Sequence, residues 1–490
     1  MKAFKKYPFF LFLLAIFFCL HGFVENYELV FLKSLSVTFF YTVVFIFLLY
    51  ILSFVLIKQS VVAALATFFI SVYILFFGAF LDAIKSISFF SWMHSYKLFI
   101  PISFFILGVL ILLVKRTENI RMKLFTFFNL LLILYCLYDT VLLSFKVRGK
   151  TNIDVISKMN LIEVKHKPNV YLMLFDEYPG YQSLESDFNF KNDLFYDSMK
   201  LNGFEFFSTS SNYNNTFFSM ASLLNMQYVN KLYDSKGITS KDDFARLAEI
   251  KNNNVTNCFK SMGYKINNLS IFDIGNAQAA QPNLYVTTNT DLITNKVFYK
   301  RFFKDIGLQQ LSKTTTFNSF FESYFLKNEV SNKNIEQSIQ FIASNKTKAP
   351  HFTYAHFLMP HFPYYQDSLG KSINIRKQIS EDLLYNKSYF VSYLKYVNTA
   401  ILKMTNHIIS KDSSAIIMVL SDHGFRNNKD SFLSANQFNN ICSIRFPKAV
   451  KHDFTNLKSN VNLFPFLFNK HFGQKLDILP DSTIFLKEKR

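Results

Sequence analysis

The first 145 residues contain five long apolar runs with few charges, and these runs constrain the fold more than any other feature of the chain. A lipid bilayer has a hydrocarbon core of about 30 Å, which an α-helix of roughly 20 apolar residues crosses. A single run of this kind is also typical of a buried core helix, but five in series predict a transmembrane bundle. The predicted spans are about Tyr7–Phe23, Leu35–Ile57, Val61–Phe80, Leu98–Val114 and Leu124–Phe145.

Lysine and arginine residues in the short loops predict the orientation of this bundle, because such residues collect on the cytoplasmic side. One side holds Lys2, Lys5, Lys6, Lys58, Lys115, Arg116, Arg121 and Lys123, whereas the other side holds only Lys33, Lys85 and Lys97. With five spans, everything after Phe145 then lies outside. The sequence therefore predicts a multi-pass protein of a bacterial cytoplasmic (inner) membrane whose C-terminal part is extracytoplasmic, and periplasmic where an outer membrane exists.

The chain has a formal net charge of +19, and half of its 490 residues are hydrophobic. A basic chain sometimes binds nucleic acid, but an exported domain argues against that partner. The charge is more simply explained by solubility and by attraction to an anionic membrane surface.

After about residue 152, apolar runs of strand length alternate with longer segments of helical length. The predicted strands are 169–175, 204–208, 265–272, 352–358, 415–420 and 441–446, and the predicted helices are 184–201, 217–226, 241–262, 331–344, 379–409 and 462–471. This alternation predicts an α/β domain with a largely parallel sheet covered on both faces. Active sites of such sheets form at the C-terminal ends of the strands.

Three predicted strands end in polar clusters. The run from Asn169 ends in the adjacent carboxylates Asp176 and Glu177, and the run from Ala415 ends in Ser421–Gly424, which has the sequence Ser-Asp-His-Gly. A third strand leads to His361, which lies between two prolines. Burying a carboxylate is costly unless a cation or a donor offsets the lost hydration. Carboxylates together with imidazole are ligands for a divalent metal such as Zn²⁺ or Mn²⁺.

A fourth element begins with the polar turn Ser211–Asn215 and continues into an apolar run of helical character. Thr216 should therefore be the N-cap or lie in the first turn of a helix. Free N–H groups and the helix dipole at this position favour an anion. A hydroxyl group there, close to a metal, is suited to attack a phosphorus or sulfur centre.

Each of these features also has an ordinary structural explanation. Asp176 and Glu177 could cap a helix, Ser421–Gly424 could form a turn, His361 could be a structural histidine, and Thr216 could be only a cap. Their combination and order along the chain favour a functional site.

These motifs resemble those of a known superfamily. Pro168–Glu177 resembles the opening motif of sulfatases, and Ser421–Gly424 resembles the Ser-Asp-His-Gly signature of the alkaline phosphatase/sulfatase superfamily. His361 matches the histidine of the superfamily's Pro-His-x-Pro turn. The resemblance extends over about Lys167–Pro480 and implies an alkaline-phosphatase-like α/β/α sandwich.

The five predicted spans make the layout similar to that of the membrane-anchored, sulfatase-like transferase branch, which includes lipid A phosphoethanolamine transferases and lipoteichoic acid synthases. The transferases have a Thr-x-x-Ser motif at the start of a helix, and Thr216–Ser219 has this spacing. The expected organisation is a transmembrane domain in residues 1–147, a linker in 148–167 and an extracytoplasmic sulfatase-like catalytic domain in 168–490.

The resemblance implies a metal held by Asp176, Thr216, Asp422 and His423, with Thr216 also serving as the nucleophile. Glu177 would be the second acidic ligand of the sulfatase pair, which the transferases usually lack.

In the same scheme, His361 would stabilise the charge of the transferred group or assist its leaving group. Asn215 would orient the substrate.

The sequence departs from these relatives in three respects. It has no (Cys/Ser)-x-Pro-x-Arg motif, which disfavours sulfate ester hydrolysis through formylglycine. It also lacks the Gly-Lys-Thr-Ser of lipoteichoic acid synthases, so glycerol-phosphate polymerisation is not supported. Cys258 and Cys442 are the only cysteines of the predicted outer domain, fewer than the several disulfides of phosphoethanolamine transferases need.

The leading hypothesis is transfer of a phospho-group, such as phosphoethanolamine or phosphoglycerol, from a membrane phospholipid to a surface glycan or lipopolysaccharide through a covalent threonine intermediate. The second hypothesis is hydrolysis of a phosphodiester or sulfate ester by the same residues. The third is an inactive superfamily member that binds a glycan or a partner, which the complete set of site residues disfavours.

Overall fold

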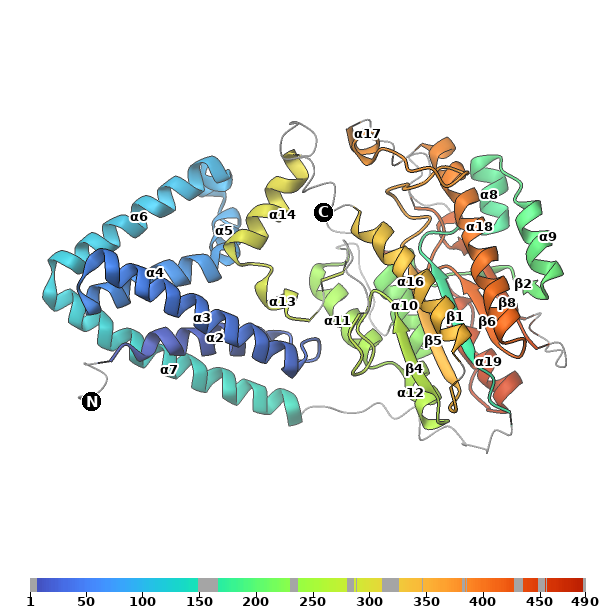
Figure 1. Cartoon of the computed structure of the whole chain (residues 1–490), viewed down its shortest axis with the longest axis horizontal. Coiled ribbons are helices and arrows are strands. Elements are labelled where there is room, and N and C mark those ends of the chain that lie inside the picture. Colours follow the sequence, from blue (N-terminus) through green and yellow to red (C-terminus); the bar gives the residue numbers. More distant parts are fainter. Residues whose placement is uncertain are drawn as a thin grey trace. The chain divides into compact units, whose positions relative to one another are not determined.

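A computed structural model of the chain describes residues 7–148, 166–229, 237–279, 286–287, 289–310, 326–345, 347–380, 384, 386–426, 435–447, 454 and 456–487. The chain divides into two compact units (Figure 1). We call residues 1–152 with 287–310 the helical unit, and residues 153–286 with 311–490 the sheet unit. Most of the predicted linker, residues 149–165, lies outside the described residues, and the predicted domain boundaries remain predictions.

The described N-terminal part of the helical unit consists of helices joined by short connections. Its helices are α2 (Phe9–Glu25), α3 (Leu32–Ile57), α4 (Ser60–Leu75), α5 (Phe77–Lys85), the 3₁₀ turn η1 (Ser88–His94), α6 (Tyr96–Arg116) and α7 (Glu118–Arg148). By length and composition, α3, α6 and α7 can span a membrane, and a fourth span results if α4 and α5, bent by 62°, are counted together. The helix α2 is apolar but has only 17 residues. Apolar helices thus lie at all five predicted positions, of which three or four meet the criteria for a span.

A short segment from far along the chain also belongs to the helical unit. Residues 287–310 contain α13 (Asp291–Thr294) and α14 (Phe298–Gln310). Two glycines make room for them, because a Cβ at Gly22 would lie 2.6 Å from Ile293 Cγ2 and a Cβ at Gly78 would lie 2.9 Å from Lys296 Cα. The sequence pattern gave no sign of this packing.

Polar contacts fasten the same segment to the helices. The Arg301 guanidinium donates to Asp82 at 3.0 Å, and the Tyr96 hydroxyl donates to Asp305 at 2.6 Å. Asn289 donates to the Ser34 hydroxyl at 2.8 Å. These partners are side chains near the ends of helices, so the segment covers one end of the bundle.

The sheet unit contains a six-stranded sheet with the order β2-β8-β6-β1-β5-β4. The strands are β1 (Val170–Phe175), β2 (Phe204–Phe206), β4 (Lys265–Leu269), β5 (His351–Phe357), β6 (Ile416–Leu420) and β8 (Cys442–Arg445). The strands β4, β5, β1 and β6 are parallel, whereas β8 is antiparallel to both β6 and β2. All six predicted strands are confirmed. The two-residue strands β3 (Thr209–Ser210) and β7 (Asn439–Asn440) form a separate pair that is too short to leave a pattern in the sequence.

Helices cover both faces of this sheet, which confirms the predicted α/β class (Figure 1). They are α8 (Tyr181–Phe188), α9 (Asp193–Leu201), α10 (Thr216–Asn225), α11 (Ser240–Lys251), α12 (Asn254–Ser261), α16 (Lys327–Ser344), α17 (Ile375–Ser380), α18 (Lys387–Lys411) and α19 (Leu463–Phe472). The predicted helix 379–409 is wrong at its start, because residues 379–380 belong to α17 and α18 begins after its N-cap Asn386. Two other predicted helices are each interrupted once. Residues 184–201 form α8 and α9, separated at Asn189 with φ 48°, and residues 241–262 form α11 and α12, where the Asn253 side chain caps the second helix.

Successive residues of the central strands point to opposite faces of the sheet. Met173, Val419 and their neighbours at odd positions join the hydrophobic core formed with α9, α16 and α18. On the other face, Phe352 of β5 stacks on Phe259 of α12 with ring centroids 4.3 Å apart and lies 6.0 Å from Phe464 of α19. Because both faces of the strands are buried, their sequences read as continuous apolar runs.

A buried polar triangle supports the residue that follows the carboxylates of β1. The Tyr178 hydroxyl donates to Asn398 of α18 and accepts from Asn192 at 2.9 Å. Asn398 in turn donates to Asn192 at 2.8 Å. All three side chains are buried, so each depends on the other two for its hydrogen bonds.

Replacement of Asn398 by alanine should lower the stability of the sheet unit by about 1–3 kcal/mol, because the buried Tyr178 hydroxyl loses its acceptor. The thermal unfolding midpoint of the purified full-length protein measures this effect. Thr399→Ala is the matched control, since Thr399 is the adjacent residue on α18 and is exposed. Equal midpoints for the two variants would contradict the importance of the triangle.

Candidate active site

The register of the parallel strands brings two predicted site residues together. Leu174 of β1 is paired with Leu420 of β6, and each residue lies two positions before an aspartate. Asp176 and Asp422 therefore leave the sheet at the same edge and on the same face, since side chains two residues apart point the same way. Both aspartates are buried.

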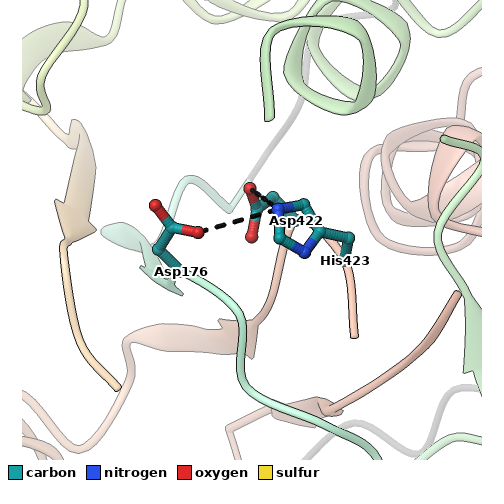
Figure 2. A group of neighbouring side chains, drawn as sticks. All are labelled: Asp176, Asp422 and His423. Atoms are coloured by element: carbon teal, nitrogen blue, oxygen red, sulfur yellow. Dashed lines mark ion pairs between the residues drawn. The ribbon is translucent and has the colours of Figure 1, made fainter. Parts of the chain in front are cut away.

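His423 completes a group of three possible metal ligands with these aspartates (Figure 2). One ligand atom from each of the three residues lies within 4.8 Å of the others. His423 Nε2 is 3.3 Å from Asp422 Oδ2 and 3.8 Å from Asp176 Oδ1. His423 Nδ1 lies 2.8 Å from the Gly424 carbonyl oxygen, which can only accept a hydrogen bond. The proton of the neutral ring is therefore on Nδ1, and the lone pair of Nε2 faces the two carboxylates.

Two buried carboxylates without enough hydrogen-bond donors favour a bound cation. Asp176 Oδ1 and Asp422 Oδ2 are buried and have no hydrogen-bond partner among the described residues. Burial, followed by the Asp422 carboxylate, raises the pKa of Asp176 well above its ordinary value, although Arg426 acts in the opposite direction. Burial, followed by the positive charge of Arg426, holds the pKa of His423 well below its ordinary value, so the ring is neutral.

Two carboxylates and a neutral imidazole with converging lone pairs fit a divalent metal such as Zn²⁺ or Mn²⁺. The carbonyl group that holds His423 Nδ1 fixes the orientation of the ring, as is usual for metal-binding histidines.

The Ser-Asp-His-Gly sequence has a structural explanation at each flanking position. The Ser421 hydroxyl accepts from the Tyr178 amide at 2.9 Å and donates to the His423 carbonyl at 2.7 Å, so it joins the two strand ends. A Cβ at Gly424 would lie 2.3 Å from the Asn436 carbonyl oxygen and 2.5 Å from that of Asn439. Only glycine fits at this position without displacement of the backbone.

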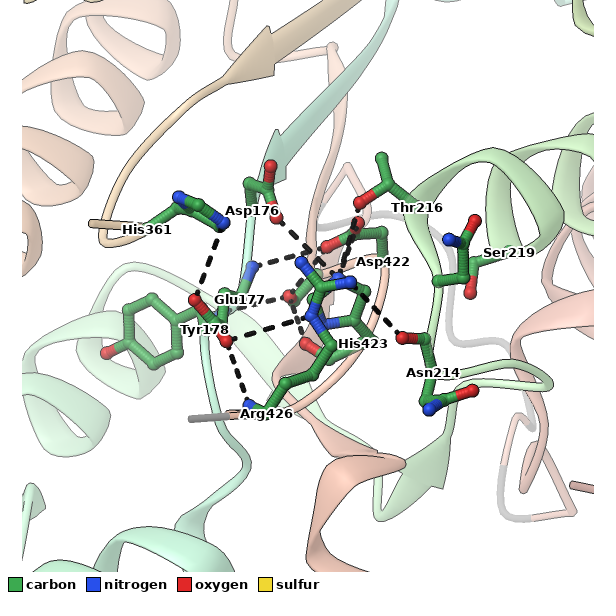
Figure 3. A network of polar contacts seen from close by, with 12 residues as sticks. Asp176, Glu177, Tyr178, Asn214, Thr216, Ser219, His361, Asp422, His423 and Arg426 are labelled. Carbon is green, nitrogen blue, oxygen red and sulfur yellow. Dashed lines mark hydrogen bonds and ion pairs between the residues drawn. The ribbon is translucent and has the colours of Figure 1, made fainter. Parts of the chain in front are cut away.

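Thr216 lies beside the metal-ligand group. It is the first residue of α10, and its hydroxyl is 3.3 Å from His423 Nε2 (Figure 3). Asn215 is the N-cap, and its side-chain oxygen accepts from the amides of Phe217 and Phe218 at 3.0 and 3.4 Å. The sequence predicted free amides at this helix start, but Asn215 occupies these two. Recognition of an anion must therefore involve other groups as well.

Glu177 lies next to Asp176 but points elsewhere. Its backbone has φ 65°, and its amide donates to Asp422 Oδ1 at 3.2 Å. Its carboxylate accepts from the Arg426 amide at 2.8 Å and lies 3.8 Å from His361 Nε2. The predicted role of Glu177 as a metal ligand remains a prediction. Its contacts favour a role in holding Arg426 and His361.

His361 follows β5 and lies beside the Glu177 carboxylate, close to the metal-ligand group (Figure 3). Its Nδ1 donates to the Phe362 carbonyl oxygen at 2.6 Å, which leaves Nε2 directed toward Glu177 Oε2. The His361 imidazole thus lies beside the same carboxylate that accepts from the Arg426 amide.

Arg426 is a site residue that the sequence analysis missed. Its Nη1 donates to the Asn214 carbonyl at 3.3 Å, and its Nε lies 3.8 Å from Glu177 Oε1. The guanidinium group thus lies between the turn before Thr216 and the strand end that carries Glu177 (Figure 3). The sequence contained one signal, because an arginine two residues after the Ser-Asp-His-Gly sequence places a fixed cation close to any metal site there.

A second pair of polar residues lies within the sheet on β5. The Tyr354 hydroxyl and His356 Nδ1 share a hydrogen bond of 3.0 Å, and both side chains are buried. Burial lowers the pKa of His356 to about 4, so this ring is neutral.

Cys258 and Cys442 are both buried and carry free thiols.

Comparison with known proteins identifies the class to which this site belongs. The family model described as Sulfatase matches residues 187–460, which is more than half of the chain. The chain therefore belongs to the sulfatase family, within the alkaline phosphatase/sulfatase superfamily. The matched range includes Thr216, His361, Asp422 and His423. No sequence among the curated proteins matches the chain at a significant level.

Solved structures similar to this chain have low sequence identity. The C-terminal periplasmic domain of EcEptC from Escherichia coli, in complex with Zn, is 11% identical with a TM-score of 0.38, and the match covers 64% of this chain and 84% of that one. The corresponding domain of phosphoethanolamine transferase EptC from Campylobacter jejuni is 13% identical with a TM-score of 0.37, covering 63% and 91%. A putative sulfatase from Bacteroides thetaiotaomicron is 12% identical with a TM-score of 0.38, covering 66% and 73%. The family assignment rests on the family model.

Asp422→Asn should reduce the affinity for Zn²⁺ or Mn²⁺ by at least about tenfold, since even residues that only orient a metal ligand often contribute this much. Metal content is measured by elemental mass spectrometry after equilibrium dialysis of the full-length protein. Asp197→Asn removes an exposed carboxylate of α9 and should leave the metal content unchanged. A full metal complement in Asp422→Asn would remove Asp422 from the ligand set.

Proposed function

We propose that this protein transfers a phospho-group, such as phosphoethanolamine or phosphoglycerol, from a membrane phospholipid to a cell-surface glycan through a covalent intermediate on Thr216. The observation that carries the proposal is the position of the Thr216 hydroxyl, 3.3 Å from His423 Nε2 at the margin of the metal-ligand group. A threonine with only a capping role would not require two buried aspartates and a neutral histidine beside it.

The residues of the site divide the chemistry among themselves. A divalent cation held by Asp176, Asp422 and His423 would supply Lewis-acid stabilisation of the anionic oxygens. Thr216 gives its hydroxyl proton to solvent as its Oγ1 forms the new bond to phosphorus, and the start of α10 favours the negative charge that develops on that oxygen. The bond from phosphorus to the diacylglycerol oxygen breaks at the same time. In the second half of the reaction the acceptor oxygen forms a bond to phosphorus, the bond to Thr216 Oγ1 breaks, and Thr216 takes a proton back from solvent.

His361 and Arg426 act on the leaving, acceptor and non-bridging oxygens. His361, held beside Glu177, gives a proton to the departing diacylglycerol oxygen and later takes one from the acceptor hydroxyl. The Arg426 guanidinium binds a non-bridging oxygen of the phospho-group. Donation by Arg426 compensates for the helix amides that Asn215 occupies.

A lipid donor is supported by the helical unit, which has three or four helices able to span a membrane. The segment 287–310, whose neighbours in sequence belong to the sheet unit, contacts Gly22, Ser34, Gly78 and Tyr96. The distribution of lysine and arginine predicts that the corresponding helix ends lie on the outer side of a cytoplasmic membrane. This agreement supports an extracytoplasmic position for the site, where lipid headgroups of the outer leaflet and surface glycans are accessible.

Hydrolysis is the second candidate function, and membership of the sulfatase family favours it. The same residues would serve, with water as the acceptor in the second half of the reaction. Product analysis with and without a glycan acceptor separates the two functions, because only a transferase forms a modified glycan.

The full-length protein, purified with metal and incubated with phosphatidylethanolamine, should carry a covalent adduct on the peptide that contains Thr216. Peptide mass spectrometry locates the adduct, and its mass identifies the transferred group. Thr216→Val should abolish both the adduct and turnover, because the methyl group that replaces the hydroxyl cannot attack phosphorus.

Ser222→Ala is the control for this experiment. Ser222 lies on the same helix, and its buried hydroxyl has no hydrogen-bond partner among the described residues. This variant should keep wild-type activity. Undiminished turnover in Thr216→Val would refute the nucleophile assignment.

Arg426→Gln should lower kcat/KM by about tenfold to a hundredfold, because a hydrogen bond to a charged group contributes about 1.5–3 kcal/mol. Its metal content should stay at the wild-type level, since Arg426 is not one of the proposed ligands. Arg426→Lys should recover part of the loss by restoring the charge without the two-pronged geometry. Steady-state kinetics on a soluble phosphodiester measure the effect, and loss of metal together with activity would indicate a structural role instead.

A further inference from the structure

The helical unit contains a cavity of about 390 Å³ that the proposed chemistry does not explain. It is lined by α2, α3, α4 and the segment 287–310, all of which belong to the helical unit. Its volume lies within the range of small-molecule binding sites. Figure 1 shows the elements that surround it.

One wall of the cavity is a single face of α3. The lining residues Thr38, Tyr41, Thr42 and Phe45 follow the spacing of one helix face. The two threonine hydroxyls donate to carbonyl groups one turn earlier, those of Ser34 at 3.1 Å and Thr38 at 2.8 Å. Because these polar atoms are satisfied within the helix, the wall offers mainly methyl groups and rings. Such a cavity gives water few hydrogen-bond partners.

The segment 287–310 supplies a polar rim. Lys300 lines the cavity, and its ammonium group donates to Thr294 at 2.7 Å and pairs with Asp291. An ammonium group has three donors, and the third has no partner among the described residues. The segment as a whole is basic, with Lys296, Lys300, Arg301 and Lys304 against Asp291 and Asp305, and Asp82 of α5 pairs with Arg301 and Lys296. The positive charge of this segment favours binding of an anionic group of a ligand.

The cavity lies in one half of the bundle. With a rise of 1.5 Å per residue, Thr38 and Phe45 are roughly 9 and 20 Å from the start of α3 at Leu32, whereas the whole helix is about 39 Å long. The start of α3 is also the end that the segment 287–310 covers, through the bond from Asn289 to Ser34. With the start of α3 at the membrane interface, as its apolar composition predicts, the apolar wall lies at the depth of acyl chains in a single leaflet and the basic rim at the depth of their headgroups.

We infer that this cavity holds an acyl chain of a glycerophospholipid whose phosphate group lies at Lys300. An apolar pocket in lipid-facing helices, closed at one end by a basic segment, matches the two chemical parts of such a lipid and their order along the membrane normal. The further step, that the bound lipid is the phospho-group donor, rests on the proposed function. The segment 287–310, which lines the proposed lipid site, is continuous in sequence with the sheet unit at both of its ends.

Photo-crosslinking tests the inference on the full-length protein in lipid nanodiscs. The probe is phosphatidylethanolamine with a diazirine in one acyl chain, and peptide mass spectrometry maps the labelled residues. Label should concentrate on residues 38–45 of α3 and on 297–300. Thr42→Trp, which fills the cavity, should lower this labelling several-fold. Leu48→Trp adds the same side chain at an exposed position of the same helix and should leave the labelling unchanged.

Label spread evenly over the exposed faces of α3 and α6, or unchanged in Thr42→Trp, would overturn the inference. Lys300→Gln provides a second test that places no bulk in the core. Wild-type protein should prefer the phospholipid probe to a diacylglycerol carrying the same diazirine, and Lys300→Gln should lose this preference. Equal labelling of the wild type by the two probes would overturn the assignment of the phosphate group to Lys300.

Crosslinking requires no turnover, so its outcome is independent of the proposed reaction. A protein that captures the lipid in the cavity but transfers no group would keep the lipid site and lose the proposed function. An active enzyme without label in the cavity would keep the function and lose this site.

Discussion

Repulsion among three electron-rich groups is the constraint on which the rest of the sheet unit depends. Asp176, Asp422 and His423 direct lone pairs at one point in a buried environment. Such an arrangement is costly unless a cation offsets it, so the surrounding structure must hold these groups in place. The parallel pairing of β1 with β6 sets their spacing, the Ser421 hydroxyl joins the strand ends, and the Gly424 backbone fits against neighbouring carbonyl groups.

The acidic residues of the site have two different tasks. Asp176 and Asp422 face the metal position, whereas Glu177 turns away and contacts Arg426 and His361. Glu177 has φ 65° directly after β1, and its carboxylate lies beside the Arg426 amide and His361 Nε2 instead of beside the metal position. Asp176 and Asp422 thus favour a metal. Glu177 holds the Arg426 guanidinium and the His361 imidazole, which are able to bind a phospho-group.

The proposed lipid site extends the same chemistry into the helical unit. Gly22 and Gly78 permit close approach of the segment 287–310, which brings basic residues to an apolar cavity between membrane helices. Residues 287–310 pack in the helical unit, but the residues before and after them in the sequence belong to the sheet unit. That connection gives a physical reason why a transferase would place its donor lipid there.

The sequence by itself determined the features that depend on local pattern. Uninterrupted apolar runs located the apolar helices of the N-terminal part, apolar runs of strand length located all six strands of the main sheet, and polar clusters after three of these strands located candidate site residues. Asp176, His361, Asp422 and His423 were predicted in this way, because the C-terminal ends of parallel strands share one edge, whereas Thr216 was predicted from the polar turn that precedes a helix. Only the tertiary structure decided the strand order, the orientation of Glu177, the recruitment of Arg426 and the packing of residues 287–310 against the membrane helices. These features arise from contacts between residues hundreds of positions apart, which leave no periodic signal in the local sequence.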